Sequence, residues 1–145
     1  MLEVRICLLV ALIVTTTSVT SAEDYILPTG VTVLTEEQLL NQIIGNTLVA
    51  GYENWVDYFE SPTGDQKKGR FKGKSAKSTE PYGGSWEVKG VLMCLQFDKS
   101  NMAQLNKCVT TVLDGDIVTW YQTNGFPWYN RYRTLKLVSG NPENF

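Results

Sequence analysis

The stretch Tyr82–Phe97, YGGSWEVKGVLMCLQF, decides the fold that the sequence predicts. On each side of Gly90 stands a short run rich in β-branched, aromatic and other apolar residues, which is typical of two strands joined by a turn. Two glycines precede Trp86, and glycine at the start of a strand lets another chain approach closely. The stretch therefore predicts the central hairpin of a β domain rather than an active-site loop.

Similar short runs continue on both sides of this hairpin. Downstream, Asp114-Gly115 is a strong hairpin signal between two further runs, and Asn124-Gly125 is another turn. The other predicted strands are 47–52, 54–61, 66–73, 107–113, 116–123 and 131–138. About eight strands without a crossover helix predict a mainly β fold, an antiparallel meander that curls into a barrel-like sheet. A barrel removes exposed edges, and a two-sheet sandwich is the alternative.

One short helix is predicted before the strands. Thr35 and Gln38 have the spacing of a capping box, and Gly45 is a natural stop. Apolar residues fall on one stripe at helical spacing: Leu39, Leu40, Ile43 and Ile44. We expect this helix to pack on the core of the domain.

The first 22 residues have the pattern of a secretory signal peptide. Arg5 precedes the apolar run 6–14, and Thr20 and Ala22 stand at the minus-three and minus-one positions of a cleavage site. An uncleaved anchor is the alternative, although the run is shorter than the roughly 20 residues of a comfortable span. We expect an exported chain with an extended lead-in at 23–34, one β-rich domain at 35–145 and no second membrane-crossing segment.

Cleavage would leave two cysteines, Cys94 and Cys108, on the runs that flank the segment 98–106. An even number of cysteines in an oxidising compartment favours a disulfide, which needs Cα atoms about 5.5 Å apart. Two buried thiols are one alternative. A redox pair is another, but it lacks the CxxC spacing and a histidine that would lower a thiol pKa.

The chain contains no histidine, which excludes Ser-His-Asp and Cys-His nucleophiles and imidazole metal sites. The carboxylates offer little: Asp57 and Glu60 flank two aromatics, and Asp114 and Asp116 are typical turn residues. A glycosidase would need two convergent carboxyl groups, which spacing cannot show. We therefore expect a non-enzymatic protein without a cofactor or a metal.

Aromatic residues supply the candidate ligand site. Trp86 is either a core residue or a pocket-lining one, and six aromatics gather between Trp120 and Tyr132 around one turn. These aromatics either close a barrel mouth or contact a partner protein. The leading hypothesis is a small apolar ligand held in a cup lined by Trp86, Trp120 and Trp128.

A basic run supplies a second hypothesis. Six cations stand within eleven residues without an acid: Lys67, Lys68, Arg70, Lys72, Lys74 and Lys77. They are candidates for contact with an anionic surface or partner of the cell envelope, and the alternative is a solvated strand whose charges protect an edge. Nucleic acid is not expected, because the net charge is −2 and Phe71 is the only interleaved aromatic.

The order of these features resembles a family of small exported proteins from alphaproteobacteria, described as a domain of unknown function. The match covers roughly residues 35 to 118 and is carried by Gly45-Asn46-Thr47, Gly84, Trp86, Cys94 and Cys108. The resemblance implies a bacterial, periplasmic location and a compact, mostly β domain, and it implies no reaction. The Gly84-Ser85-Trp86 triplet also looks like the lipocalin signature, which in lipocalins lies on the first strand. Its position in mid-chain leaves an architectural analogy only.

Overall fold

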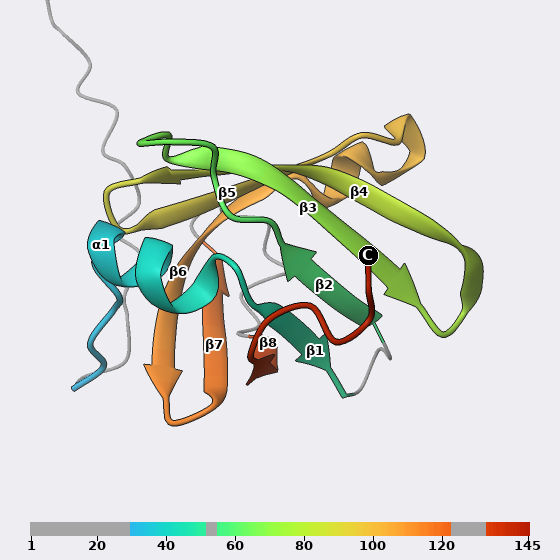
Figure 1. Cartoon of the computed structure of the whole chain (residues 1–145). Coiled ribbons are helices and arrows are strands. Elements are labelled where there is room, and N and C mark those ends of the chain that lie inside the picture. Colours follow the sequence, from blue (N-terminus) through green and yellow to red (C-terminus); the bar gives the residue numbers. More distant parts are fainter. Residues whose placement is uncertain (1–29, 52–54, 123–132) are drawn as a thin grey trace, which may run out of the picture.

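A computed structural model describes residues 30–51, 55–122 and 133–145. In it these residues form one closed barrel of eight antiparallel strands (Figure 1). Each strand pairs with the next, and β8 pairs with β1. The strands are β1 (Thr47–Ala50), β2 (Trp55–Phe59), β3 (Lys68–Ser75), β4 (Ser78–Lys89), β5 (Leu92–Phe97), β6 (Lys107–Asp114), β7 (Ile117–Gln122) and β8 (Arg133–Val138). The predicted meander barrel is confirmed, and the sandwich is not formed. The predicted signal peptide and the Asn124-Gly125 turn lie outside the described residues.

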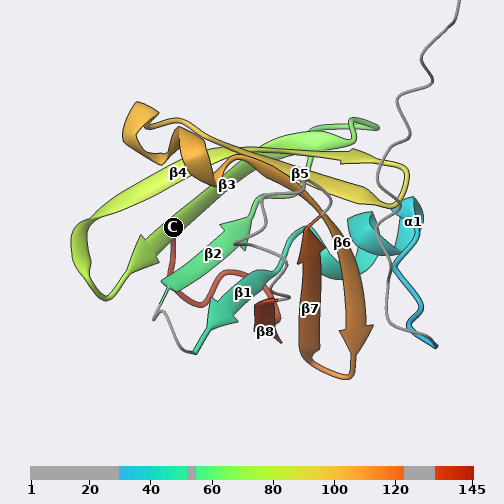
Figure 2. The ribbon, with the colours of Figure 1, turned by 180° about the vertical axis from the view of Figure 1, so that it is seen from behind.

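The barrel has two different ends. At the helix end, where β2, β4 and β6 finish, lies the helical segment α1 (Glu36–Gln38), which continues as a π-helical turn, η1 (Leu39–Ile43). At the mouth end, where β1, β3, β5 and β7 finish, lies the 3-10 helix η2 (Ser100–Leu105). Figures 1 and 2 show α1 and η2 on opposite sides of the barrel.

The helix forms where the capping residues predict it. Thr35 and Gln38 exchange their side-chain and backbone hydrogen bonds in a capping box, and Gly45, at φ 83°, ends the helical segment. The apolar stripe is directed into the barrel, with buried side chains at Leu39, Ile43 and Ile44. The helix therefore fills this end of the core, as expected.

The motif Gly45-Asn46-Thr47 joins the helix to the seam at which the barrel closes. The Asn46 side chain donates to the carbonyl of Gln42 and accepts from the backbone N–H of Gly140, at 3.0 and 2.9 Å. The buried hydroxyl of Thr47 donates to the carbonyl of Gly140 at 2.6 Å. These bonds anchor the chain just after β8 to the start of β1, so the motif has a structural role.

Large rings fill the barrel because glycines stand opposite them. Gly69 is paired with Trp86, and a Cβ atom on Gly69 would lie 2.7 Å from the Trp86 indole. A Cβ atom on Gly84 would collide with the carbonyl of Gln96 and with the ring of Phe71. Both rings are fully buried in a continuous core. Gly84, just before Trp86, thus has the predicted role of allowing close approach.

The central hairpin begins earlier than the predicted stretch Tyr82–Phe97, since β4 begins at Ser78. Pro81 and its small polar neighbours are typical of a loop. They are tolerated because the pairing of β4 with β5 begins only at Gly84, with one further backbone bond at Gly83, so that β3 is the only partner strand given for the earlier residues of β4 in the described chain. A proline in such an edge segment removes no ladder hydrogen bond on its open side.

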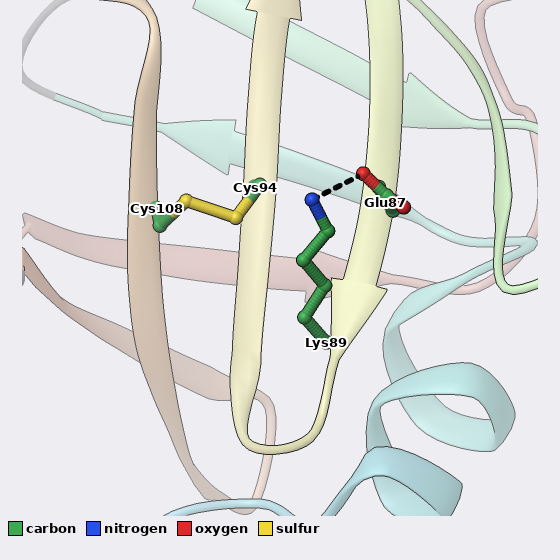
Figure 3. Close-up of a disulfide and its surroundings, with 4 residues drawn as sticks. All are labelled: Glu87, Lys89, Cys94 and Cys108. Atoms are coloured by element: carbon green, nitrogen blue, oxygen red, sulfur yellow. Dashed lines mark ion pairs between the residues drawn. A yellow bond between two sulfur atoms is a disulfide. The ribbon is translucent and has the colours of Figure 1, made fainter.

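The predicted disulfide is formed between Cys94 on β5 and Cys108 on β6 (Figure 3). The two residues are directly opposed in the register, and their Cα atoms lie 3.9 Å apart, closer than expected. Next to Cys94, on β4, lies the exposed ion pair of Glu87 with Lys89. The disulfide lies outside the core and joins the two strands that lead into and out of η2.

We expect the disulfide to stabilise the fold by about 3 kcal/mol, because it closes a loop with a sequence separation of 14 residues. Urea unfolding of the wild type with and without reductant should show this difference in the free energy of unfolding. The Cys94→Ala/Cys108→Ala variant is the control and should not respond to reductant. Equal unfolding midpoints for oxidised and reduced wild type would contradict the prediction.

Candidate functional site

A pocket of about 330 Å³ lies at the mouth end, and we call it the mouth pocket. Its volume is at the lower end of the range of roughly 300–1,000 Å³ that small-molecule sites occupy. Side chains from seven of the strands and from η2 contribute to it. The lining residues are Trp55, Asp57, Ser75, Lys77, Tyr82, Leu95, Phe97, Met102, Leu105, Lys107, Trp120 and Arg133.

Aromatic rings form much of the wall of the mouth pocket. Trp55 on β2 and Trp120 on β7 are stacked, with ring centroids 6.4 Å apart and an interplanar angle of 29°. Tyr82 and Phe97 form a second pair, with centroids 5.9 Å apart. Such rings present a rigid apolar surface to a ligand.

One carboxylate lies inside this aromatic wall. Asp57 occupies an inward position of β2, is 4% exposed, and accepts a hydrogen bond of 2.7 Å from the hydroxyl of Tyr82. Burial raises the pKa of Asp57 from 3.8 to about 7, although the Tyr82 hydrogen bond and the charges of Lys107 and Arg133 act in the opposite direction. The carboxyl group is therefore poised to change its charge near neutral pH.

Two cations stand against the tryptophans. The Lys107 ammonium lies 5.8 Å from the centroid of the Trp120 ring, and the Arg133 guanidinium lies 5.8 Å from that of Trp55. Both distances are in the range of cation–π attraction. With Lys77, the described lining residues comprise three cations and one carboxylate.

The pocket wall also holds an unpaired donor. Among the described residues, the buried Nε1 of Trp120 has no hydrogen-bond partner. An indole N–H can only donate, and a buried polar group without a partner costs about 1–3 kcal/mol. This unpaired N–H is therefore a local cost to stability in the barrel interior.

The predicted ligand-lining tryptophans are in different places. Trp120 lines the mouth pocket. Trp86 is 1% exposed and lies toward the helix end, where its Nε1 donates to the carbonyl of Glu60 at 3.2 Å. Trp128 lies outside the described residues. The structure brings Trp120 together with Trp55, a tryptophan that the sequence reasoning had not selected.

The predicted basic run follows the outer face of β3. Four of its cations form ion pairs with acids from distant parts of the chain, and Lys77 lines the mouth pocket. Lys68 is exposed. The pairs are Lys67 with Glu36, Arg70 with Asp98, Lys72 with Glu60 and Lys74 with Glu143. These acids lie outside the basic run in the sequence, so the sequence pattern did not pair them with its cations. They partly neutralise its charge.

Sequence reasoning did not assign four polar residues of the mouth pocket to a ligand site: Asp57, Tyr82, Lys107 and Arg133. One available signal was the alternation along β2, which places Asp57 on the same face as the apolar Trp55 and Phe59. An acid at an inward position of a strand is rare unless it is paired or functional.

Comparison with known proteins finds no family model, no curated protein and no solved structure that matches this chain. Within the described parts of the chain, no group of three or more potential metal-ligating side chains comes together. None of the helices among these residues has the length and apolar character needed to cross a membrane.

We expect Asp57→Asn to change the pH dependence of stability. Because the folded pKa of Asp57 is raised, the native state binds more protons than the unfolded state between pH 3.8 and about 7. The free energy of unfolding should fall across this window in the wild type, by at most about 4 kcal/mol. The asparagine amide resembles the neutral acid, so the variant should be more stable than the wild type at pH 8 and equally stable at pH 4.

Urea unfolding from pH 4 to 8 measures this effect. Asp65→Asn removes an exposed acid of the β2–β3 connection and is the control, which should keep the wild-type slope. The prediction fails if Asp57→Asn and wild type lose stability in parallel as the pH rises.

Gly73 is required for the contact between Asp57 and Tyr82. A Cβ atom at this position would collide with the Asp57 carboxylate and the Tyr82 ring, whereas one on Gly51 would meet nothing within 4 Å. We expect Gly73→Ala to lower the free energy of unfolding by roughly 1–3 kcal/mol through overpacking. Gly51→Ala should have little effect in the same thermal unfolding measurement, and equal melting temperatures for the two variants would refute the assignment.

Proposed function

We propose that this protein is a non-enzymatic binding protein that holds a small apolar ligand in the mouth pocket. The observation that carries the proposal is the difference between the two barrel ends. Apolar residues of the helix fill one end, whereas the other keeps a pocket of about 330 Å³ walled by tryptophan, tyrosine and phenylalanine rings. A concave, mainly apolar site with a few convergent polar groups is typical of small-molecule recognition.

The proposal includes an exported, periplasmic or secreted location. It is supported by the signal-peptide pattern of residues 1–22, by the disulfide, and by the resemblance to the small exported alphaproteobacterial family. The eight-stranded meander barrel has the architecture by which lipocalins enclose small ligands, and the analogy extends to architecture alone.

Two other functions have less support. An acid-pair enzyme would need a second carboxyl group beside Asp57, and the described lining residues of the mouth pocket include one carboxylate only. Contact of the basic run with an anionic envelope surface is weakened by the ion pairs of Lys67, Arg70, Lys72 and Lys74. Ligand binding in the mouth pocket is therefore the function that we put forward.

The neutral fluorescent probe N-phenyl-1-naphthylamine tests the proposal. We expect saturable, one-to-one binding to the folded, oxidised protein. Leu105→Trp replaces a lining side chain with a larger indole that fills part of the pocket, and it should weaken binding at least tenfold. Ala103→Trp adds the same ring at an exposed position of η2, outside the pocket lining, and should bind like the wild type. No saturable binding, or equal binding by both variants, would overturn the proposal.

A further inference from the structure

Two cations of the mouth pocket come from the two strands that flank the strand of Trp120. Lys107 is the first residue of β6, and Arg133, the first residue of β8, is directly opposite Trp120 on β7. Both cations lower the pKa of the same carboxyl group, that of Asp57, so both act within one electrostatic environment. The barrel therefore brings two cations from neighbouring parts of its wall to a single buried site.

The polar groups of this wall are mainly hydrogen-bond donors. The Lys107 ammonium and the Arg133 guanidinium can only donate hydrogen bonds. A ligand group that accepts hydrogen bonds and carries negative charge is complementary to this set. A cationic ligand would meet like charges at the same place.

Asp57 is compatible with such a ligand because its carboxyl group can be protonated, and therefore neutral, near neutral pH. Among the described residues, the polar groups that act on its pKa are Tyr82 from β4, Lys107 from β6 and Arg133 from β8, while the paired positions on β1 and β3 are the uncharged Leu48 and Gly73. A nearby anion favours the neutral form of a carboxyl group. Binding of an anion would therefore be accompanied by uptake of a proton by Asp57.

We propose that the ligand is a small organic anion, with an acidic group held by Lys107 and Arg133 and an apolar body packed against Trp55 and Trp120. This inference rests on the proposed function and names its ligand class. The acid is a carboxylate or a sulfonate, and the body is small because the pocket holds about 330 Å³.

Isothermal titration calorimetry with three probes of one shape tests the charge preference. These probes are 2-naphthoate, the neutral 2-naphthamide and the cationic 2-naphthylmethylammonium. At pH 6.5 we expect 2-naphthoate to bind at least tenfold more tightly than 2-naphthamide, and the ammonium to bind most weakly. The pair octanoate and octanol repeats the comparison with a flexible alkyl chain in place of the naphthyl ring. A preference for the acid in either the naphthyl pair or the octyl pair supports the proposal.

Variants connect this preference to the two cations. Lys107→Gln and Arg133→Gln should each weaken 2-naphthoate binding about tenfold and should affect 2-naphthamide binding much less, so that the preference for the acid falls. Arg133→Lys keeps the charge and should retain most of the preference. Lys136→Gln removes an exposed cation from the same strand as Arg133, outside the pocket lining, and is the matched control. Circular dichroism establishes that each variant is folded.

The affinity for 2-naphthoate should rise as the pH falls from 8 to 6, because protonated Asp57 no longer repels the anion. Asp57→Asn should bind 2-naphthoate tightly across this range and lose the pH dependence. Equal binding of the acid and its neutral analogue in both pairs by the wild type would overturn the inference and leave the proposed function standing. If none of the probes binds, N-phenyl-1-naphthylamine included, both fail.

Discussion

The hydrogen-bonded pairing of β1 with β8 is the constraint on which the rest of this structure depends. It turns a meander with two edges into a closed wall, and it brings Arg133 to the same interior as Asp57. β1 is short, and the side chains of Asn46 and Thr47 reinforce the seam through Gly140. Residues far apart in the sequence thus form one pocket because the barrel closes.

Inside the closed wall, the distribution of glycines decides which parts are filled. Gly69 and Gly84 admit the rings of Trp86 and Phe71, so that the half of the barrel nearer the helix is packed. Gly73 uses the same device nearer the mouth, where it lets the Tyr82 ring reach Asp57. Close packing leaves no room for water or a ligand in the half nearer the helix. The aromatic pocket therefore lies in the half nearer the mouth.

Local signals in the sequence predicted the hairpins, the capped helix, the disulfide and the barrel-like meander. They could not predict the start of β4. Pro81 would cost a ladder hydrogen bond only if a second strand paired with β4 at that position, and the sequence does not show whether one does. The pocket was harder to predict, since alternation assigns a residue to the inner face but not to one end of the barrel. Lys107 and Arg133 look like ordinary strand-start cations until the register places them beside Asp57.

A buried carboxylate among aromatic rings lowers stability unless its charge is compensated, and the wall around Asp57 compensates that charge only in part, since the pKa stays raised to about 7. One hydroxyl donor from Tyr82 and two cations face a group that is itself partly neutral near pH 7. A core selected for stability alone would replace this set with apolar side chains of similar volume. The disulfide between β5 and β6 holds the adjacent wall in place, and the indole N–H of Trp120 remains without an acceptor among the described residues. An acidic ligand held by Lys107 and Arg133 would favour the neutral form of Asp57 and so remove the charge whose burial is costly.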